Sequence, residues 1–535
     1  MENATETMPA VKLGSRQRVD VIEHIRSLVE RHERLFVASC LIFYVVLAVC
    51  LANVRPPQSD EGHFADGALH IATTGRFIMP TWTDWLPTLN QRVYAAMPLY
   101  FYGLAGWFRI FGIGMLSMRY FSVFWGAVLV LAYYLLVRNV TANRVIAWVV
   151  LLVLVFNYDL INLTTARYDG MAAGLGAAGL ALYAVLRERN LAVAILAANA
   201  CIAAAAMSHP YGSFAFASFV VLFFTLERNR LRVNYIALAA LPYVVALACW
   251  GLYISQDVAM FKTQFGANAA AHKSSLLAPL SLVRGELYDR YWVLFAGERA
   301  RVPIYMRVKL GVLLLYVVSF GSSLLIPKIR EDKVARALLT CAIVGFVALM
   351  LADGSHLYIY LVHVIGFYSI VVGIWLTYMM SAGRWQRAVS IAILCGLAAF
   401  TVASMAYRMR MNSYENAFLK TADYVSNHVT DKQLVFAGGE FAFAASFDRH
   451  LVDDAQLGYR NHKRPDYIVV GKEYDARFLR QKQERPEVYS YVTRTLRMYR
   501  VVFASKAGSD YYRVYGSPES VMEKSSAEPK GQKAP

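Results

Sequence analysis

Eleven apolar runs, each of about twenty residues, constrain this chain more than any other feature of its sequence. Runs of this length are typical of helices that cross a lipid bilayer, because a helix satisfies its backbone hydrogen bonds internally. They explain why the 535-residue chain is 57% hydrophobic and only 17% charged. We expect membrane-spanning helices at residues 35–54, 117–137, 145–163, 170–187, 191–207, 211–226, 234–254, 304–326, 335–352, 356–379 and 388–407.

The turns between these runs indicate which way the chain crosses. Lysine and arginine gather in alternate turns, and such turns face the cytoplasm by the positive-inside rule. These basic turns contain Arg138 and Arg144, Arg187 and Arg189, Arg228 to Arg232, Lys328 to Arg336, and Arg384 and Arg387. Residues 1–34, a basic polar leader, then also lie in the cytoplasm, and the first run is a retained anchor rather than a cleaved signal peptide. Residues 55–116, 164–169, 208–212, 255–303, 353–356 and everything after residue 407 face outward.

The apolar segment 95–113 is long enough to span, yet we expect it to lie in the membrane interface. Counting it as a span would place Arg138 and Arg144 outside and invert every later turn. Pro98 and Arg109 interrupt it, and tyrosine and tryptophan are spread along it, as in interfacial helices. We therefore predict eleven spans with two surface helices near residues 60–74 and 96–112. A twelve-span bundle is the alternative.

The character of the chain changes after residue 407. Residues 408–516 contain a helical stretch at 417–428 and strand-like runs at 434–437, 467–470, 500–504 and 511–515, which predicts a small α/β domain outside the membrane. Residues 517–535 are rich in lysine, glutamate and serine, and we expect them to be disordered. All six cysteines lie in apolar runs, so we expect neither disulfides nor a structural zinc site. Much of the net charge of +17 sits in short turns between the spans, so nucleic acid is not an expected partner.

Two adjacent carboxylates, Asp60 and Glu61, follow closely on the first span. Acidic residues are favoured in the first turn of a helix, and this preference is enough to explain one of the two carboxylates. Asp60 and His63 are three residues apart and can share a helix face. The later outward turns also carry ionisable groups, namely Arg167 and Asp169, His209, and Asp353 with His356. A single such residue is usually a solvated cap, but charged groups that gather at one face of a bundle indicate a substrate or a pathway.

The order of several short motifs resembles the GT-C superfamily of membrane glycosyltransferases. It is most similar to protein O-mannosyltransferases and to bacterial transferases of aminoarabinose or galacturonic acid to lipid A. The resemblance covers about residues 35–230 and then continues only in topology. The motifs are Asp60-Glu61, Thr74-Gly75-Arg76-Phe77, Met97-Pro98-Leu99-Tyr100-Phe101-Tyr102, Phe111-Gly112, Met118-Arg119-Tyr120-Phe121-Ser122, Arg167-Tyr168-Asp169-Gly170 and His209-Pro210-Tyr211-Gly212.

The resemblance implies transfer of a sugar from a polyprenyl-phosphate carrier to a hydroxyl of a glycan, lipid or protein on the outer face of a bacterial inner membrane. It implies that Asp60 is the general base of a direct, inverting attack and that Asp169 orients the acceptor or the sugar. Donor and phosphate contacts would come from cationic and polar groups. The candidates for these contacts are Glu61, His63, Arg167, His209, His356, Arg299 and Arg301.

The chain also departs from the family pattern. Some members place a Glu-Lys pair before the Pro-Leu-Tyr segment, whereas this chain has Ala95-Ala96-Met97. We therefore assign no metal site and no cofactor, although Asp60, Glu61 and His63 could hold a divalent cation. His356 stands where a lysine or arginine often precedes the later tyrosine-rich span, which would make donor binding sensitive to pH.

Two other functions remain open from the sequence. The first is a transporter or flippase of lipid-linked sugars, although such proteins usually have ionisable groups in mid-membrane and internal repeats, which this chain lacks. The second is a non-catalytic partner in envelope assembly. Residues 274–283 form an amphipathic segment that either covers the lipid entrance or anchors the bundle. We expect the C-terminal domain, including Asp453-Asp454 and residues 459–463, to select the acceptor.

Overall fold

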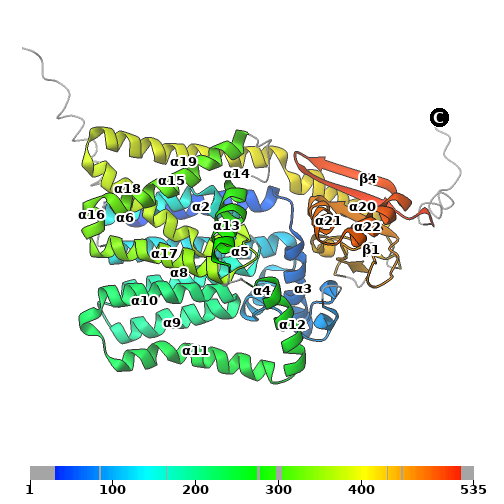
Figure 1. Cartoon of the computed structure of the whole chain (residues 1–535), viewed down its shortest axis with the longest axis horizontal. Helices are drawn as coiled ribbons and strands as arrows, with labels where there is room; N and C mark the ends of the chain where they lie inside the picture. The colour runs from blue at the N-terminus through cyan, green and yellow to red at the C-terminus, as the bar shows by residue number, and fades with distance from the viewer. Residues whose placement is uncertain are drawn as a thin grey trace, which may run out of the picture.

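A bundle of apolar helices lying side by side forms the larger part of the molecule (Figure 1). The computed structural model describes residues 31–83, 86–141, 143–163, 166–273, 278–296, 304–430, 432–447 and 450–519. Among these residues, nine helices are long and apolar enough to cross a membrane. They are α2 (Glu33–Val54), α5 (Met115–Val140), α8 (Tyr168–Leu186), α9 (Leu191–Ser208), α11 (Val233–Ile254), α15 (Ile304–Leu325), α17 (Lys333–Ala352), α18 (Ile365–Ala382) and α19 (Arg384–Met411).

Two shorter apolar helices complete the set, α6 (Arg144–Val155) and α10 (Phe214–Leu226), the latter preceded by the 3₁₀ turn η3 (Pro210–Ser213). Together the eleven helices correspond one for one to the predicted spans. The third predicted span is interrupted after α6, because the Asn157 side chain accepts the Leu160 N–H at 2.9 Å and starts the short helix α7 (Tyr158–Leu163). The tenth begins later than expected, since η6 (Tyr358–His363) occupies its first residues.

The basic turns gather at one end of the bundle, which we call the basic end. Glu33 lies 3.0 Å from Arg138 and 3.8 Å from Arg144, which links the start of α2 to the turn between α5 and α6. The short elements η4 (Arg228–Arg230) and α16 (Pro327–Glu331) form two other basic turns. The alternation of charge in the sequence therefore corresponds to two distinct ends of the bundle.

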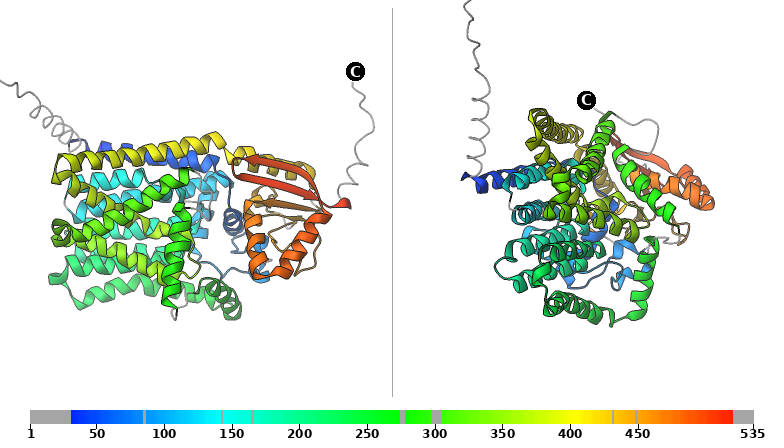
Figure 2. Two further views of the ribbon diagram at one scale, coloured as in Figure 1. Left: turned by 45° about the horizontal axis from the view of Figure 1, so that its top comes forward. Right: turned by 60° about the vertical axis from the view of Figure 1, so that its left-hand side comes forward.

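At the opposite end, short helices lie between the bundle and the C-terminal domain (Figures 1 and 2). The first loop forms α3 (Ser59–Thr74), η1 (Pro80–Trp82), η2 (Pro87–Asn90) and α4 (Leu99–Phe111). With 13 residues α4 is about 20 Å long, too short to cross about 30 Å of hydrocarbon. The long loop forms α12 (Val258–Ala271), α13 (Pro279–Gly285), the π-helical η5 (Glu286–Trp292) and α14 (Val293–Ala296).

The C-terminal domain is a five-stranded sheet with helices, reached through the long helix α19 (Figure 2). Its strand order is β2-β1-β3-β5-β4, in which β1 is parallel to β2 and β3, and β5 is antiparallel to β3 and β4. A two-residue turn closes the β4–β5 hairpin, with Gly508 at φ +60°, as such turns require. The elements are η7 (Tyr414–Leu419), α20 (Lys420–His428), β1 (Val435–Phe436), η8 (Gly439–Phe443), β2 (Leu451–Val452), β3 (Tyr467–Gly471), α21 (Lys472–Glu484), α22 (Pro486–Met498), β4 (Arg500–Ala507) and β5 (Asp510–Gly516).

The four predicted strands and the predicted helix of this domain are present, and β2, α21 and α22 are additional. Most of the buried apolar residues lie in the bundle, with a separate cluster under α3 and α4 and two on the faces of the sheet. The predicted fold class, a polytopic helical membrane protein with a small C-terminal α/β domain, is confirmed.

Candidate active site

Asp60 lies in the first turn of α3, at the end of the bundle opposite the basic turns. The helix begins there because Gln58 and Glu61 form a reciprocal capping box across its first turn. The carboxylate of Asp60 pairs with the guanidinium of Arg167, which precedes α8. The side chain of Asp60 remains 34% exposed, whereas that of Arg167 is buried. The first loop and the turn before α8 thus meet at one place.

Arg167 joins this carboxylate to a second one. Its Nε atom donates to Asp169 Oδ2 at 3.0 Å, and its guanidinium lies over the rings of Phe64 and Tyr168. Burial opposes the charge of Arg167, but the neighbouring carboxylate of Asp169 outweighs this effect and raises the arginine's pKa. Arg167 is therefore a fixed positive charge between Asp60 and Asp169.

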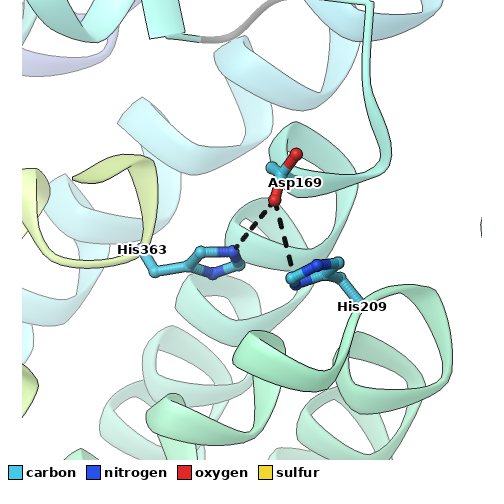
Figure 3. Close-up of side chains that lie close together, drawn as sticks. All are labelled: Asp169, His209 and His363. Carbon is cyan, nitrogen blue, oxygen red and sulfur yellow. Dashed lines mark ion pairs between the residues drawn. The ribbon is translucent and has the colours of Figure 1, made fainter. Parts of the chain in front are cut away.

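Two histidines from different elements face the other oxygen of Asp169 (Figure 3). Asp169 Oδ1 lies 3.8 Å from His209 Nδ1 and 3.7 Å from His363 Nε2, and all three residues are buried. Neither Asp169 Oδ1 nor His363 Nε2 has a hydrogen-bond partner among the described residues. One carboxylate and two imidazoles are a donor set that suits Zn²⁺ or a similar ion. Among the described residues, these three form a group that could hold a cation, whereas Asp60, Glu61 and His63 each pair with a different residue.

His209 is neutral and held between aromatic rings. Its ring stacks on those of Tyr168 and Tyr360, with centroid-to-centroid distances of 4.5 Å and 5.5 Å. Its Nδ1 atom accepts a hydrogen bond from the backbone N–H of Tyr211. Burial lowers the pKa of His209 to about 3, although the carboxylate of Asp169 opposes this shift. The imidazole therefore acts near neutral pH as a hydrogen-bonding or metal-binding group rather than as a cation.

A cavity of about 330 Å³ opens beside His209. His272 and Lys273 line it as well, and none of its described lining residues is acidic. Residues 95–97, which stand where some family members carry a Glu-Lys pair, form part of its wall. A second, almost wholly apolar groove of about 540 Å³ lies between α4, α9 and α11. Met97 lines the cavity and Pro98 the groove, so the polar and apolar spaces are adjacent.

Glu61 is a structural residue in this arrangement. Its carboxylate is fully buried and accepts hydrogen bonds from Arg119 Nε at 2.7 Å and from Arg55 Nη2 at 3.1 Å. Arg119 also donates to the carbonyls of Ala52 and Arg55. The carboxylate thus connects the start of α3 to the C-terminal end of α2 and to the N-terminal part of α5. It faces these arginines rather than the cavity.

His63 also turns away from Asp60, although the two residues lie in the same helix. Its Nε2 atom lies 2.9 Å from Asp453 of the C-terminal domain, and its ring stacks on Trp82 at 4.5 Å. Sequence spacing allowed Asp60 and His63 to share a face. In the structure each contacts a different partner, Arg167 or Asp453.

His356 belongs to a separate buried ionic network in the long loop. It lies 3.1 Å from Glu286, which also pairs with the fully buried Arg290 at 2.8 Å. Arg290 in turn contacts Asp353 at 3.0 Å. Burial would raise the pKa of Asp353, but hydrogen bonds from His272 and Ser355 and the charge of Arg290 lower it to about 2. This network attaches η5 to the turn after α17.

Some sequence-predicted positions fall elsewhere. Arg299, Arg301 and residues 274–277 lie outside the described residues, while the rest of the expected amphipathic segment forms the start of α13. Sequence reasoning missed His363, Arg119 and Asp453 as site components. His363 stood in a tyrosine-rich apolar run, and a histidine in such a run is itself a signal. Arg119 was part of a recognised motif, but only the structure shows its partner.

Comparison with solved structures identifies the fold. ArnT from Cupriavidus metallidurans bound to undecaprenyl phosphate matches with a TM-score of 0.53 and 14% identity, over 90% of this chain and 97% of that chain. AglB from Archaeoglobus fulgidus, in complex with an inhibitory peptide and a dolichol-phosphate, matches with a TM-score of 0.54 and 12% identity, over 90% of this chain and 74% of that chain. This is the GT-C glycosyltransferase fold.

The family resemblance expected from the motifs is confirmed at the level of this fold, and it extends beyond residue 230 to most of the chain. The GT-C fold and the apolar helices together identify a multi-pass membrane protein. No protein-family model matches the chain, and no curated protein sequence matches it.

Proposed function

We propose that this protein is a membrane glycosyltransferase that moves a sugar from a polyprenyl-phosphate carrier to an acceptor hydroxyl. Asp60 is the general base. One observation carries this proposal: of the acidic residues in α3, Asp60 alone is accessible, whereas Glu61 and Asp66 are fully buried and bound to other groups. A base must reach the proton that it removes, so this exposure favours Asp60 for the role.

The reaction requires one base and a stabilised leaving group. The acceptor oxygen attacks the anomeric carbon while its proton passes to Asp60. The bond from that carbon to the phosphate oxygen breaks, and its electron pair stays on the phosphate. Direct displacement of this kind inverts the anomeric centre. Arg167 pairs with the carboxylate of Asp60 and places a positive charge beside the group that accepts the proton.

The two adjacent spaces support a lipid-linked donor. The cavity beside His209 has cationic and hydrogen-bonding walls without acidic side chains, which suits a phosphate. The apolar groove along α9 and α11 suits an isoprenoid chain. The matched ArnT structure contains undecaprenyl phosphate and the matched AglB structure contains a dolichol-phosphate, which supports a donor of this class.

A divalent cation fits the donor set of Asp169, His209 and His363, where it would supply Lewis-acid stabilisation of negative charge. With the basic turns in the cytoplasm, Asp60 and residues 408–516 face outward, and we assign the protein to a bacterial inner membrane. Arg299 and Arg301, in the long loop, are further candidates for binding the phosphate.

The test uses a strain from which the gene has been deleted. This strain is complemented with the wild-type gene, with Asp60→Asn or with Asp289→Asn, and the uncomplemented deletion strain is called the empty strain. Asp289 is an exposed acid in the long loop and is the matched control. Mass spectrometry of polyprenyl-phosphate sugars and envelope glycans should show accumulated donor and one missing glycan substituent in the empty strain and with Asp60→Asn. Asp289→Asn should resemble the wild type.

Asp60→Asn should lower transfer by about 10²- to 10⁴-fold, the usual contribution of a general base. Normal glycans with Asp60→Asn would reject the base assignment. Donor that is found only on the cytoplasmic face of vesicles from the empty strain would instead indicate a flippase.

A further inference from the structure

A buried carboxylate of the C-terminal domain binds the first turn of α3, the helix that carries Asp60. Asp453, next to β2, accepts hydrogen bonds on Oδ2 from Ser59 Oγ at 2.6 Å and from the Gly439 N–H at 3.2 Å, and His63 Nε2 lies 2.9 Å away. Its Oδ1 atom accepts from Tyr474 at 2.9 Å and from Arg477 at 3.0 Å. All five groups converge on one side chain that is 8% exposed as a residue.

The backbones of the two parts also approach closely at this point. A Cβ atom added to Gly62 would lie 1.7 Å from the carbonyl oxygen of Gly439, and one added to Gly439 would lie 2.5 Å from the Ser59 carbonyl oxygen. The Ser59 N–H donates to Glu473 of α21 at 3.1 Å. The first turn of α3 is therefore seated directly on η8 and α21.

Ser59, His63 and Asp453 do not form a catalytic triad. Both the serine and the aspartate approach the same nitrogen of His63, whereas a triad uses the two ring nitrogens separately. The other nitrogen, Nδ1, has no partner among the described residues. The serine hydroxyl donates to the carboxylate rather than to the imidazole. The cluster therefore connects two domains and has no nucleophile ready to react.

We propose that Asp453 is a positioning residue that fixes the first turn of α3, so that the carboxylate of Asp60 is in place for transfer only when the C-terminal domain is docked. This inference rests on the proposed role of Asp60. The residues that Asp453 binds, Ser59 and His63, lie on either side of Asp60 in the sequence. Among the described residues, the side chain of Asp60 pairs with Arg167 of the bundle.

The base is thus located by two supports on opposite sides. Burial would raise the pKa of Asp453, but Arg477 and the hydrogen bonds from His63 and Ser59 outweigh it and hold the pKa well below its usual range. The carboxylate is therefore ionised and remains a strong acceptor. A catalytic group displaced by about 1 Å can cost about 10²-fold in rate, so a modest loosening of α3 is sufficient to slow transfer.

The test compares Asp453→Asn with Asp510→Asn in the full-length protein. Asp510, the first residue of β5, is another aspartate of this domain with a largely buried side chain, but it accepts a hydrogen bond from Ser413 at 2.8 Å and lies 3.9 Å from Lys472, both within its own domain. We expect Asp453→Asn to lower kcat by about 10- to 100-fold with less than about a twofold change in the donor KM. Asp510→Asn should leave kcat within about twofold. Asp453→Glu should restore part of the loss.

Hydrogen exchange of residues 59–74 provides a readout that does not depend on catalysis. These amides should exchange faster in Asp453→Asn than in the wild type or Asp510→Asn. Ser59→Ala, which removes one hydroxyl and leaves the domain intact, should shift both readouts in the same direction if Asp453→Asn does not fold. Faster exchange with unchanged kcat, or unchanged exchange, would overturn the proposal. Unchanged transfer by Asp60→Asn would instead reject the base assignment, and this result is separate from the exchange measurement.

Discussion

Replacing Glu61 with glutamine separates the two neighbouring acids of α3 by their physical roles. The Glu61 carboxylate is fully buried and accepts from Arg119 Nε at 2.7 Å, Arg119 Nη2 at 3.3 Å and Arg55 Nη2 at 3.1 Å. Glutamine keeps one acceptor oxygen and presents an NH₂ group to these donors. Glu61→Gln therefore leaves two arginines with a buried positive charge that is only partly compensated.

The size of the effect follows from this geometry. Removing one partner of a buried ion pair lowers the free energy of unfolding by about 3–5 kcal/mol. Because glutamine keeps one acceptor oxygen, we expect Glu61→Gln to lower it by about 3 kcal/mol. That value corresponds to about a 160-fold change in the folding equilibrium constant. Asp60→Asn removes a pair whose carboxylate side is one-third exposed, so its cost stays below about 1 kcal/mol.

Thermal unfolding in nanodiscs, with transfer measured on the folded fraction, distinguishes the two variants. We expect Glu61→Gln to melt well below the wild type and Asp60→Asn to melt close to it. Turnover per folded molecule should fall most for Asp60→Asn and less for Glu61→Gln, which keeps Asp60 and one of the oxygens that hold the first turn of α3. A Glu61→Gln protein that melts like the wild type but fails to bind donor would refute the structural role of Glu61 and restore it as a substrate-binding residue.

Three further outcomes are expected. In the apolar groove, Ala200→Trp should raise the donor KM at least about tenfold, because the indole occupies space needed for the isoprenoid chain. Val193→Trp, on the same helix but outside the groove, should leave the donor KM unchanged. Equal KM values for the two variants would exclude the groove as the binding site of the isoprenoid chain. Zn²⁺ should raise the melting temperature of the wild type but not of His363→Gln; the same shift in both would remove the histidine cluster as a cation site. Burial raises the pKa of Glu440 well above its usual 4.5, so the folded state binds the proton more tightly than the unfolded state does. The free energy of unfolding therefore falls as the pH rises from 4.5 toward the raised pKa. Glu440→Gln should remove that decline, and identical melting profiles against pH would contradict it.

The sequence contained most of the information about the bundle. Apolar runs longer than a bilayer is thick must become helices, because no other isolated segment satisfies its backbone in lipid. Charge alternation between the runs separated the basic turns from the turns that carry Arg167 and His209. The short length of α4 agrees with a surface helix, which the position of Arg138 and Arg144 had required. The small sheet was recognisable from its strands, but β2, with only two residues, was too short to show a pattern.

The partners of individual side chains were decided only by the tertiary structure. Asp60, Glu61 and His63 share one helical turn in sequence, yet they contact Arg167, Arg119 and Asp453 respectively. A helix displays successive side chains about 100° apart, so neighbours in sequence face different surroundings. Local spacing specified the helix, and the packing of the bundle and the C-terminal domain around it determined which carboxylate remained accessible.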